Sequence, residues 1–150
     1  MTEVTTKDVE RIFSVIANRY DILNSILTLN IDKIWRKKAI KTCNIKEGQK
    51  VLDLCCGTGQ MINYECKAVG KNTTVTGVDF SQEMLNVGAK RLNNSIKAYK
   101  FKLVRGSILE LPFEENTFEC ITIAFGLRNI PDKNKALSEM YRVLKPGGKL

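Results

Sequence analysis

The sequence contains no histidine among its 150 residues. A Ser-His-Asp triad and a Cys-His pair are therefore excluded within them, because both use an imidazole as the general base. The five cysteines form no Cys-x-x-Cys pair, and without histidine they argue against a zinc site. Any chemistry must then come from a cofactor or from carboxylate, tyrosine, lysine or arginine side chains, and we expect no bound metal.

Long hydrophobic runs are also missing. No apolar run approaches the roughly 18 residues that a membrane-spanning helix needs, and the first residues include acids but no apolar signal core. The odd number of cysteines and the Cys55-Cys56 doublet are typical of reduced thiols that serve in packing. We therefore expect a cytoplasmic protein whose 150 residues form one domain core.

The net charge of +8 raises the question of an anionic partner. A nucleic-acid surface gathers basic residues in a patch with interleaved aromatic side chains, but here the basic residues are dispersed. A solvated basic face, or transient contact with anionic lipid head groups, explains the charge as well. We expect no nucleic-acid partner, and the sequence is compatible with peripheral contact at the inner face of a membrane.

The stretch from Val51 to Gln60 joins a short apolar run to a tight glycine turn. An apolar run of this length predicts a buried strand of a parallel sheet. Gly57 and Gly59 allow the backbone to turn sharply and to approach a ligand closely. Because parallel α/β sheets bind ligands where strands end and helices begin, the turn marks the expected site.

Two acids indicate which ligand the turn serves. A dinucleotide fold needs a third glycine, and Ile62 stands at that place, so the pattern argues against NAD. Asp53, before the turn, suits a cationic group such as the amino group of S-adenosylmethionine. Asp79 closes the next apolar run, where a carboxylate can accept hydrogen bonds from both ribose hydroxyls. The alternative is that both acids only cap the loops that follow them.

Residues 1–45 are predicted to form a helical layer against the sheet, which can roof the site and hold an apolar substrate. Helix is expected from Thr6 to Thr42, with a break at Asn30-Ile31-Asp32, and its apolar stripe consists of Phe13, Ile16, Tyr20, Leu23 and Leu27. After the break, the side chains expected to face inward are Ile34, Trp35 and Ala39, and those expected to face water are Arg36, Lys37, Lys38 and Lys41.

Residues 46–150 alternate between strand and helix patterns, which predicts a mainly parallel α/β sheet. The expected strands are 51–54, a run ending at Asp79, a run through 101–104, 118–124 and a fifth beginning at Lys149. The expected helices run from Gly59 to Val69, from a Ser81 cap through Leu92, and from an Asp132 cap through Leu144 to a stop at Pro146-Gly147-Gly148. The segment 125–129 is expected to line the ligand crevice.

The last two residues look like the start of a strand. A strand cut at its second residue is not a natural end, and a four-stranded sheet would leave an unprotected edge. We therefore expect this chain to be the front part of a longer protein. The later strands, with substrate contacts and a surface for homo-oligomer formation, would then lie beyond Leu150.

Five segments together resemble the ubiquinone/menaquinone biosynthesis C-methyltransferase family of class I S-adenosylmethionine-dependent methyltransferases. They are "FSVIANRYDILNSILTLNIDKIWR", "VLDLCCGTG", "VTGVDFSQEML", "LPFEENTFECITIAFGLRNIPDKNKAL" and "RVLKPGGKL". The likeness spans nearly the whole chain, and the blocks around "FGLRN" and "YD…N…W" are more specific than the glycine turn. It implies a Rossmann-like fold and S-adenosylmethionine as cofactor.

The resemblance also implies roles for individual residues. The positions expected to contact the cofactor are Asp53, Gly57, Thr58, Gly59, Asp79, Phe80, Ser107, Ile108 and Ala124. Three residues depart from the family pattern. Gln60 stands where an acid is usual, Ser107 replaces a more frequent Asn or Asp, and Ala124 replaces a frequent Ser. Ser107 still offers a hydroxyl, whereas Ala124 offers only its backbone.

The implied reaction is C-methylation of a demethylated isoprenoid quinol, from demethylmenaquinol to menaquinol. We expect Arg128 to stabilise the developing phenolate, and Asn129 and Tyr20 to orient the ring. The alternative for Arg128 is a surface ion pair, and for Tyr20 a place in the core. Other readings of the sequence are a methyltransferase for another small-molecule, lipid or RNA acceptor, and a non-catalytic cofactor-binding fragment.

Overall fold

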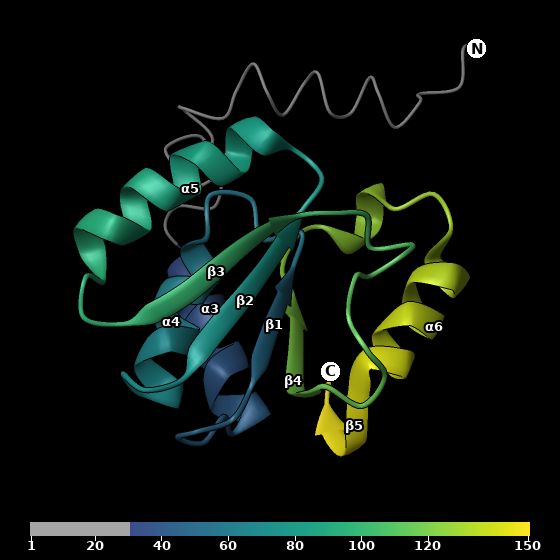
Figure 1. Ribbon diagram of the computed structural model, residues 1–150, viewed down its shortest axis with the longest axis horizontal. Helices are drawn as coiled ribbons and strands as arrows, with labels where there is room; N and C mark the ends of the chain where they lie inside the picture. The colour runs from purple at the N-terminus through teal and green to yellow at the C-terminus, as the bar shows by residue number, and fades with distance from the viewer. Residues whose placement is uncertain (1–30) are drawn as a thin grey trace.

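The computed structural model describes residues 31–150, which form a five-stranded parallel sheet with helices on both faces (Figure 1). The strands follow the order β3-β2-β1-β4-β5. Their bounds are β1 (Val51–Leu54), β2 (Thr74–Asp79), β3 (Lys100–Arg105), β4 (Phe118–Ile123) and β5 (Leu144–Lys149). The predicted α/β class with a mainly parallel sheet is confirmed.

β1 lies at the centre of the sheet and pairs with β2 on one side and β4 on the other. All four of its residues are buried, as expected for a strand covered on both faces. The chain runs outward from β1 to β2 and β3 and then returns to place β4 on the opposite side of β1. Such a reversal opens a crevice at the carboxyl ends of β1 and β4, where α/β sheets bind ligands.

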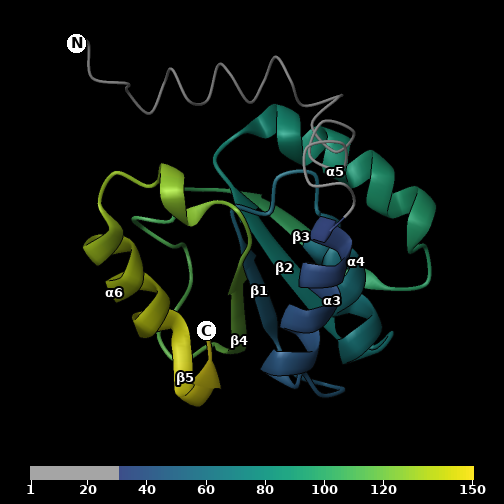
Figure 2. The same ribbon diagram turned by 180° about the vertical axis from the view of Figure 1, so that it is seen from behind.

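Within residues 31–150, α-helices cover both faces of the sheet, three on one face and one on the other, as Figures 1 and 2 illustrate. The first face carries α3 (Ile31–Cys43), α4 (Gln60–Val69) and α5 (Gln82–Ser95), and the second carries α6 (Lys133–Val143). The alternation along β1 divides its side chains between two cores. Val51 packs with the α4 side, whereas Leu52 and Leu54 pack with the α6 side.

The helix boundaries within the α/β core follow local signals in the sequence. Ser81 caps α5 by accepting a hydrogen bond from the Met84 amide, and Asp132 caps α6 in the same way at Lys135. Gly70, at a φ of 84°, ends α4 as predicted. These caps fix the loops that lead into and out of the crevice.

The predicted orientation of α3 is correct for Lys37, Lys38 and Lys41, which are exposed, but wrong for Ile34, Trp35 and Arg36. Ile34 and Trp35 are exposed, at 63% and 52%, whereas Asp32 and Arg36 are buried. Arg36 turns toward the sheet because its guanidinium lies 5.2 Å from the centre of the Phe125 ring and pairs with Asp32. The helix also contains Ile31 and Asp32, where a break was expected, and the predicted helix before residue 31 lies outside the described residues.

The end of α6 also differs from the prediction. Leu144 is extended and begins β5, so Pro146, Gly147 and Gly148 lie within the fifth strand instead of stopping the helix. A proline is tolerated there because β5 is an edge strand, and its pairing with β4 is irregular. β4 ends at Ile123, one residue before the predicted end. Within residues 31–150, no helix has the length and apolar character needed to cross a bilayer.

Candidate functional site

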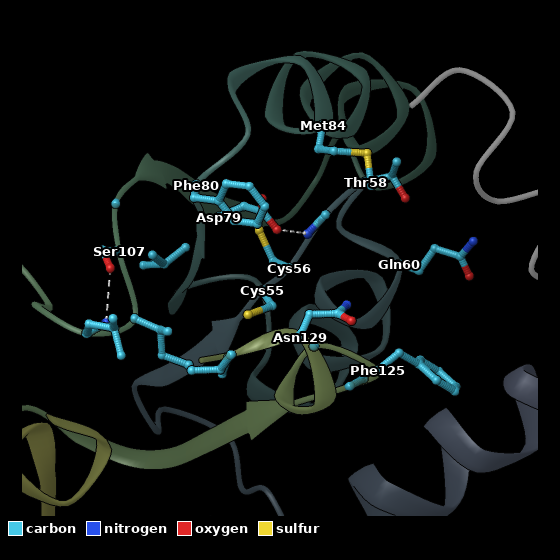
Figure 3. A pocket seen from close by; sticks show the side chains of 18 of the residues that line it. Cys55, Cys56, Thr58, Gln60, Asp79, Phe80, Met84, Ser107, Phe125 and Asn129 are labelled. Atoms are coloured by element: carbon cyan, nitrogen blue, oxygen red, sulfur yellow. Dashed lines mark hydrogen bonds between the residues drawn. The ribbon is translucent and has the colours of Figure 1, made fainter. Parts of the chain in front are cut away.

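A pocket opens at the carboxyl ends of β1, β2, β3 and β4, at the reversal point of the sheet (Figure 3). The loops after these four strands form most of its wall, and α3 contributes Arg36. Of the residues named from the sequence, the pocket brings together Gly57, Thr58, Asp79, Phe80, Ser107, Ile108, Ala124 and Asn129. These residues come from four separate loops, and they meet because the parallel strands end at the same edge of the sheet.

The glycine turn forms the floor next to the start of α4. Gly57 and Gly59 have φ values of +53° and +69°, which L side chains rarely adopt. The backbone of Thr58 also lies close to α5, where a Cβ on Gly88 would lie 3.1 Å from the carbonyl carbon of Thr58. Helix α5 therefore packs directly on the turn, and a larger residue at position 88 would push against it.

Asp79 is the acid that reaches the pocket. One carboxylate oxygen accepts a hydrogen bond from the Gly57 amide at 2.8 Å, and the other accepts one from the Ser81 amide at 3.0 Å. Burial raises the pKa of Asp79, and the hydrogen bonds from the Ser81 and Gly57 amides oppose this effect. The carboxylate thus ties the tip of β2 to the glycine turn, and its remaining lone pairs can accept hydrogen bonds from a ligand hydroxyl.

Asp53 lies beneath the pocket and is not part of its lining. It is the third residue of β1, and its side chain points to the face that α4 covers, where it accepts a hydrogen bond from the Thr122 hydroxyl at 3.1 Å. The same hydroxyl lies 2.6 Å from a carboxylate oxygen of Glu65, which is fully buried in α4. Burial raises the pKa of Asp53 to about 7 and also raises that of Glu65.

Two other predicted site residues are not part of the lining. Gly59 belongs to the turn but does not face the pocket, and Arg128 is exposed on η1 (Leu127–Asn129), the short helix after β4. Tyr20 lies outside the described residues. Asn129 follows Arg128 on the same short helix and does line the pocket, so this helix forms part of the pocket rim.

Sequence reasoning named the segment 125–129 as crevice lining, and the structure places Phe125, Gly126 and Asn129 there. It missed Arg36, Cys55 and Met84, which also line the pocket. Cys55 follows β1 and has a φ of 52°. A Cβ added to Gly126 would lie only 2.4 Å from the Cβ of Cys55. The only sequence signal for Arg36 is its position four residues after Asp32, which allows an ion pair on one helix face.

The residues in the pocket suit a nucleoside with a polar extension. Asp79 offers a carboxylate for hydroxyl groups, and the glycine turn permits close approach of the ligand to the backbone. Figure 3 shows Asp79, Phe80 and Ser107 in one part of the pocket and Gln60, Asn129 and Phe125 in another. Each part combines polar side chains with one aromatic ring, so the pocket can accommodate an elongated ligand with polar groups along its length.

Comparison with known proteins agrees with this geometry. The profile of the ubiE/COQ5 methyltransferase family matches residues 1–150. A demethylmenaquinone methyltransferase of Staphylococcus aureus (strain MRSA252) is 48% identical over 142 residues, which cover 95% of this chain and 58% of that protein. The chain therefore spans somewhat more than half the length of this relative.

Solved structures share the same architecture. A SAM-dependent methyltransferase from Aquifex aeolicus matches with a TM-score of 0.68 at 30% identity, over 74% of this chain and 58% of that one. The [4+2]-cyclase SpnF matches with a TM-score of 0.80 at 20% identity, over 96% of this chain and 58% of that one, and shows the fold alone. By the match of its full length to the family profile, the chain belongs to the ubiE/COQ5 methyltransferase family.

Proposed function

We propose that the protein binds S-adenosylmethionine in this pocket and methylates a ring carbon of a demethylated isoprenoid quinol, converting demethylmenaquinol to menaquinol. The observation that carries the proposal is the pairing of Asp79 with the Gly57 turn at the reversal point of the sheet. It occurs in a chain that is 48% identical to a protein named demethylmenaquinone methyltransferase.

The described residues fit this cofactor. Asp79 can accept hydrogen bonds from the ribose hydroxyls, and Phe80 and Ile108 offer apolar surface for the adenine ring. The Ser107 oxygen accepts a hydrogen bond from the Leu109 amide at 3.1 Å, so its own hydrogen is available for a ring nitrogen. Ala124 offers its backbone. Asp53 does not line the pocket, so when ionised it would act on the cationic amino group of the cofactor only through its negative charge.

When bound, the cofactor supplies a methyl group that its sulfonium sulfur already activates. The protein then has to hold the acceptor carbon in line with that methyl group. Such positioning of reacting groups is worth ~7–11 kcal/mol in well-oriented systems. We infer that Arg128 stabilises the negative charge on the acceptor oxygen, and that Asn129 and Tyr20 orient the ring. The position of Asn129 in the pocket rim supports this, and Arg128 is its immediate neighbour.

Exposed apolar side chains near the pocket support an acceptor with an apolar tail. Trp35 lies 6.1 Å from Phe125, measured between ring centres, and both Trp35 and Leu127 are exposed. This apolar surface and the net charge of +8 are compatible with a cytoplasmic protein that docks transiently on an anionic membrane. Residues 1–45 would serve as a cap over the acceptor.

Two measurements test the proposal in sequence. Titration calorimetry with S-adenosylhomocysteine should show binding at one site, and the Arg128→Ala variant should bind it equally well. Transfer of labelled methyl groups should then occur to demethylmenaquinol in detergent, and not to RNA or phospholipid assayed beside it. Binding without transfer to any acceptor would support the reading as a cofactor-binding fragment, and transfer to RNA would replace the proposed substrate.

A further inference from the structure

Arg36 is a buried cation in the wall of the pocket. Its residue exposure is only 7%, although arginine usually keeps its charged head in water. Among residues 31–150, Arg36 and Asp79 are the charged side chains that line the pocket, and Arg36 is the basic one. It comes from α3, which lies outside the alternating strands and helices of the core.

The hydrogen-bonding capacity of Arg36 is incompletely used. Its Nε lies 3.6 Å from a carboxylate oxygen of Asp32, which is an ion-pair distance, but this buried nitrogen donates no hydrogen bond within the described residues. Its guanidinium carbon lies 5.2 Å from the centre of the Phe125 ring. An arginine has five N–H donors, and burial without an acceptor is unfavourable. Arg36 therefore lines the pocket with at least one buried N–H, that of Nε, that has no acceptor within the described residues.

Three acids interact with this cation: Asp32 on the same helix pairs with it, and its charge lowers the pKa of Asp53 on β1 and of Glu65 on α4. The Thr122 hydroxyl lies within hydrogen-bond distance of Asp53 and of Glu65, yet it has a single hydrogen. Both hydrogen bonds can form only if one of the two carboxyl groups carries a proton. The three acids near Arg36 therefore carry two negative charges when Asp53 and Glu65 share a proton. The smaller negative charge leaves Arg36 able to attract an anion.

We propose that Arg36 binds the carboxylate of the amino-acid part of S-adenosylmethionine. This inference rests on the proposed cofactor and names the residue that holds its far end. If the ribose lay at Asp79, the amino-acid part could reach Arg36 and Phe125, which line the same pocket and contact each other. A planar carboxylate matches the guanidinium fork with two parallel hydrogen bonds. A phosphate group is a less suitable ligand for Arg36, because it carries up to two negative charges and the single positive charge of Arg36 already has three acidic neighbours.

The test compares two ligands that differ only in the carboxylate. They are S-adenosylhomocysteine and its decarboxylated counterpart, S-adenosyl-3-thiopropylamine, each titrated calorimetrically into the full chain. The wild-type protein should bind the first at least tenfold more tightly, which is about the effect of one charge-assisted pair. Arg36→Met should weaken binding of S-adenosylhomocysteine by about 10- to 100-fold and leave the decarboxylated ligand unchanged.

Two further variants separate this role from a structural one. Arg36→Lys should recover part of the difference, because lysine keeps the charge but loses the planar fork. Lys37→Met removes an exposed charge from the same helix and should leave both affinities unchanged. Equal binding of the two ligands to the wild-type protein, or an equal loss for both in Arg36→Met, would overturn the role of Arg36. If the wild-type protein bound neither ligand, the proposed function itself would fail.

Discussion

A carboxylate oxygen of Glu65 lies 2.6 Å from the hydroxyl oxygen of Thr122 in the buried layer between β4 and α4. The same hydroxyl serves Asp53, so three polar groups share one hydroxyl hydrogen and whatever proton the acids retain. Burial raises the pKa of both acids, the charge of Asp53 raises the pKa of Glu65 further, and Arg36 lowers both pKa values. The protonation state of Asp53 and Glu65 in the core is therefore coupled electrostatically to Arg36 in the wall of the pocket.

This pair should make the protein less stable as pH rises. The folded pKa of Asp53, about 7, exceeds its unfolded value of 3.8, so between these values the folded state binds more protons than the unfolded one. The contribution of this pair to the free energy of unfolding should then be fully present below about pH 4 and be lost as pH rises to about 7. Glu65→Gln removes one of the charges and should gain about 1–3 kcal/mol over the wild-type protein at pH 8, and less at pH 5.

Urea unfolding of both proteins at the two pH values measures this difference. Glu114→Gln removes the same charge from the surface and is the matched control, with no expected pH-dependent gain. An equal loss of stability for Glu65→Gln at pH 5 and pH 8 would mean that the carboxylate is needed for its hydrogen bond alone. In that case the two acids would not share a proton.

Gly126→Ala should disturb the floor of the pocket. The backbone of Gly126 is right-handed helical and accepts alanine, but the new Cβ would lie 2.4 Å from Cβ and 2.8 Å from Sγ of Cys55. Overpacking of this kind costs about 1–3 kcal/mol. Cys55→Gly removes those atoms and suits the φ of 52° at that position, so the double variant should recover most of the loss.

Thermal unfolding of the two single variants and the double variant gives this coupling. Additive effects would show that the two side chains do not meet. Recovery in the double variant, together with restored binding of S-adenosylhomocysteine, would show that Gly126 is required by its neighbour Cys55 and not by its own backbone conformation.

Much of the core could be predicted because its signals are local. Each of three correct predictions depends on only a few neighbouring residues. These are the buried strand β1, the cap at Ser81 and the helix end at Gly70. The direction in which the Asp53 side chain points could also have been predicted from the sequence. Strand alternation places it opposite to Leu52, toward α4 and away from the pocket.

The orientation of α3 could not be obtained in that way. Its apolar residues predict that Ile34 and Trp35 are buried, but the buried side of the helix carries Arg36. Partners from three other elements surround Arg36, namely Asp53, Glu65 and Phe125. Tertiary pairing of this kind depends on residues far apart in the sequence, and no periodicity in a single helix reports it.

Gly88→Ala should weaken ligand binding through the glycine turn. The added Cβ would lie 3.1 Å from the carbonyl carbon and 3.2 Å from the carbonyl oxygen of Thr58, so the turn or α5 must shift by a few tenths of an ångström. Alanine favours the helix by up to about 1 kcal/mol, which offsets part of the strain in stability but not in geometry. We expect the affinity for S-adenosylhomocysteine to fall by more than the stability does. Lys90→Ala, on the exposed side of α5, is the control and should change neither.

Asp79→Asn should reduce both affinity and stability. The two carboxylate oxygens accept hydrogen bonds from Gly57 and Ser81, and an amide has a single oxygen, so one backbone donor would face an NH₂ group. An unsatisfied buried donor costs about 1–3 kcal/mol. Because Asp79 is assigned to the ribose, the variant should weaken S-adenosylhomocysteine and methylthioadenosine alike, by about tenfold or more. Asp132→Asn, at the cap of α6, makes the same chemical change at a residue outside the pocket lining; the amide oxygen can still accept the cap hydrogen bond from Lys135, so neither affinity should change. A variant that lost affinity only for the ligand with the amino-acid part would place Asp79 at the wrong end of the pocket.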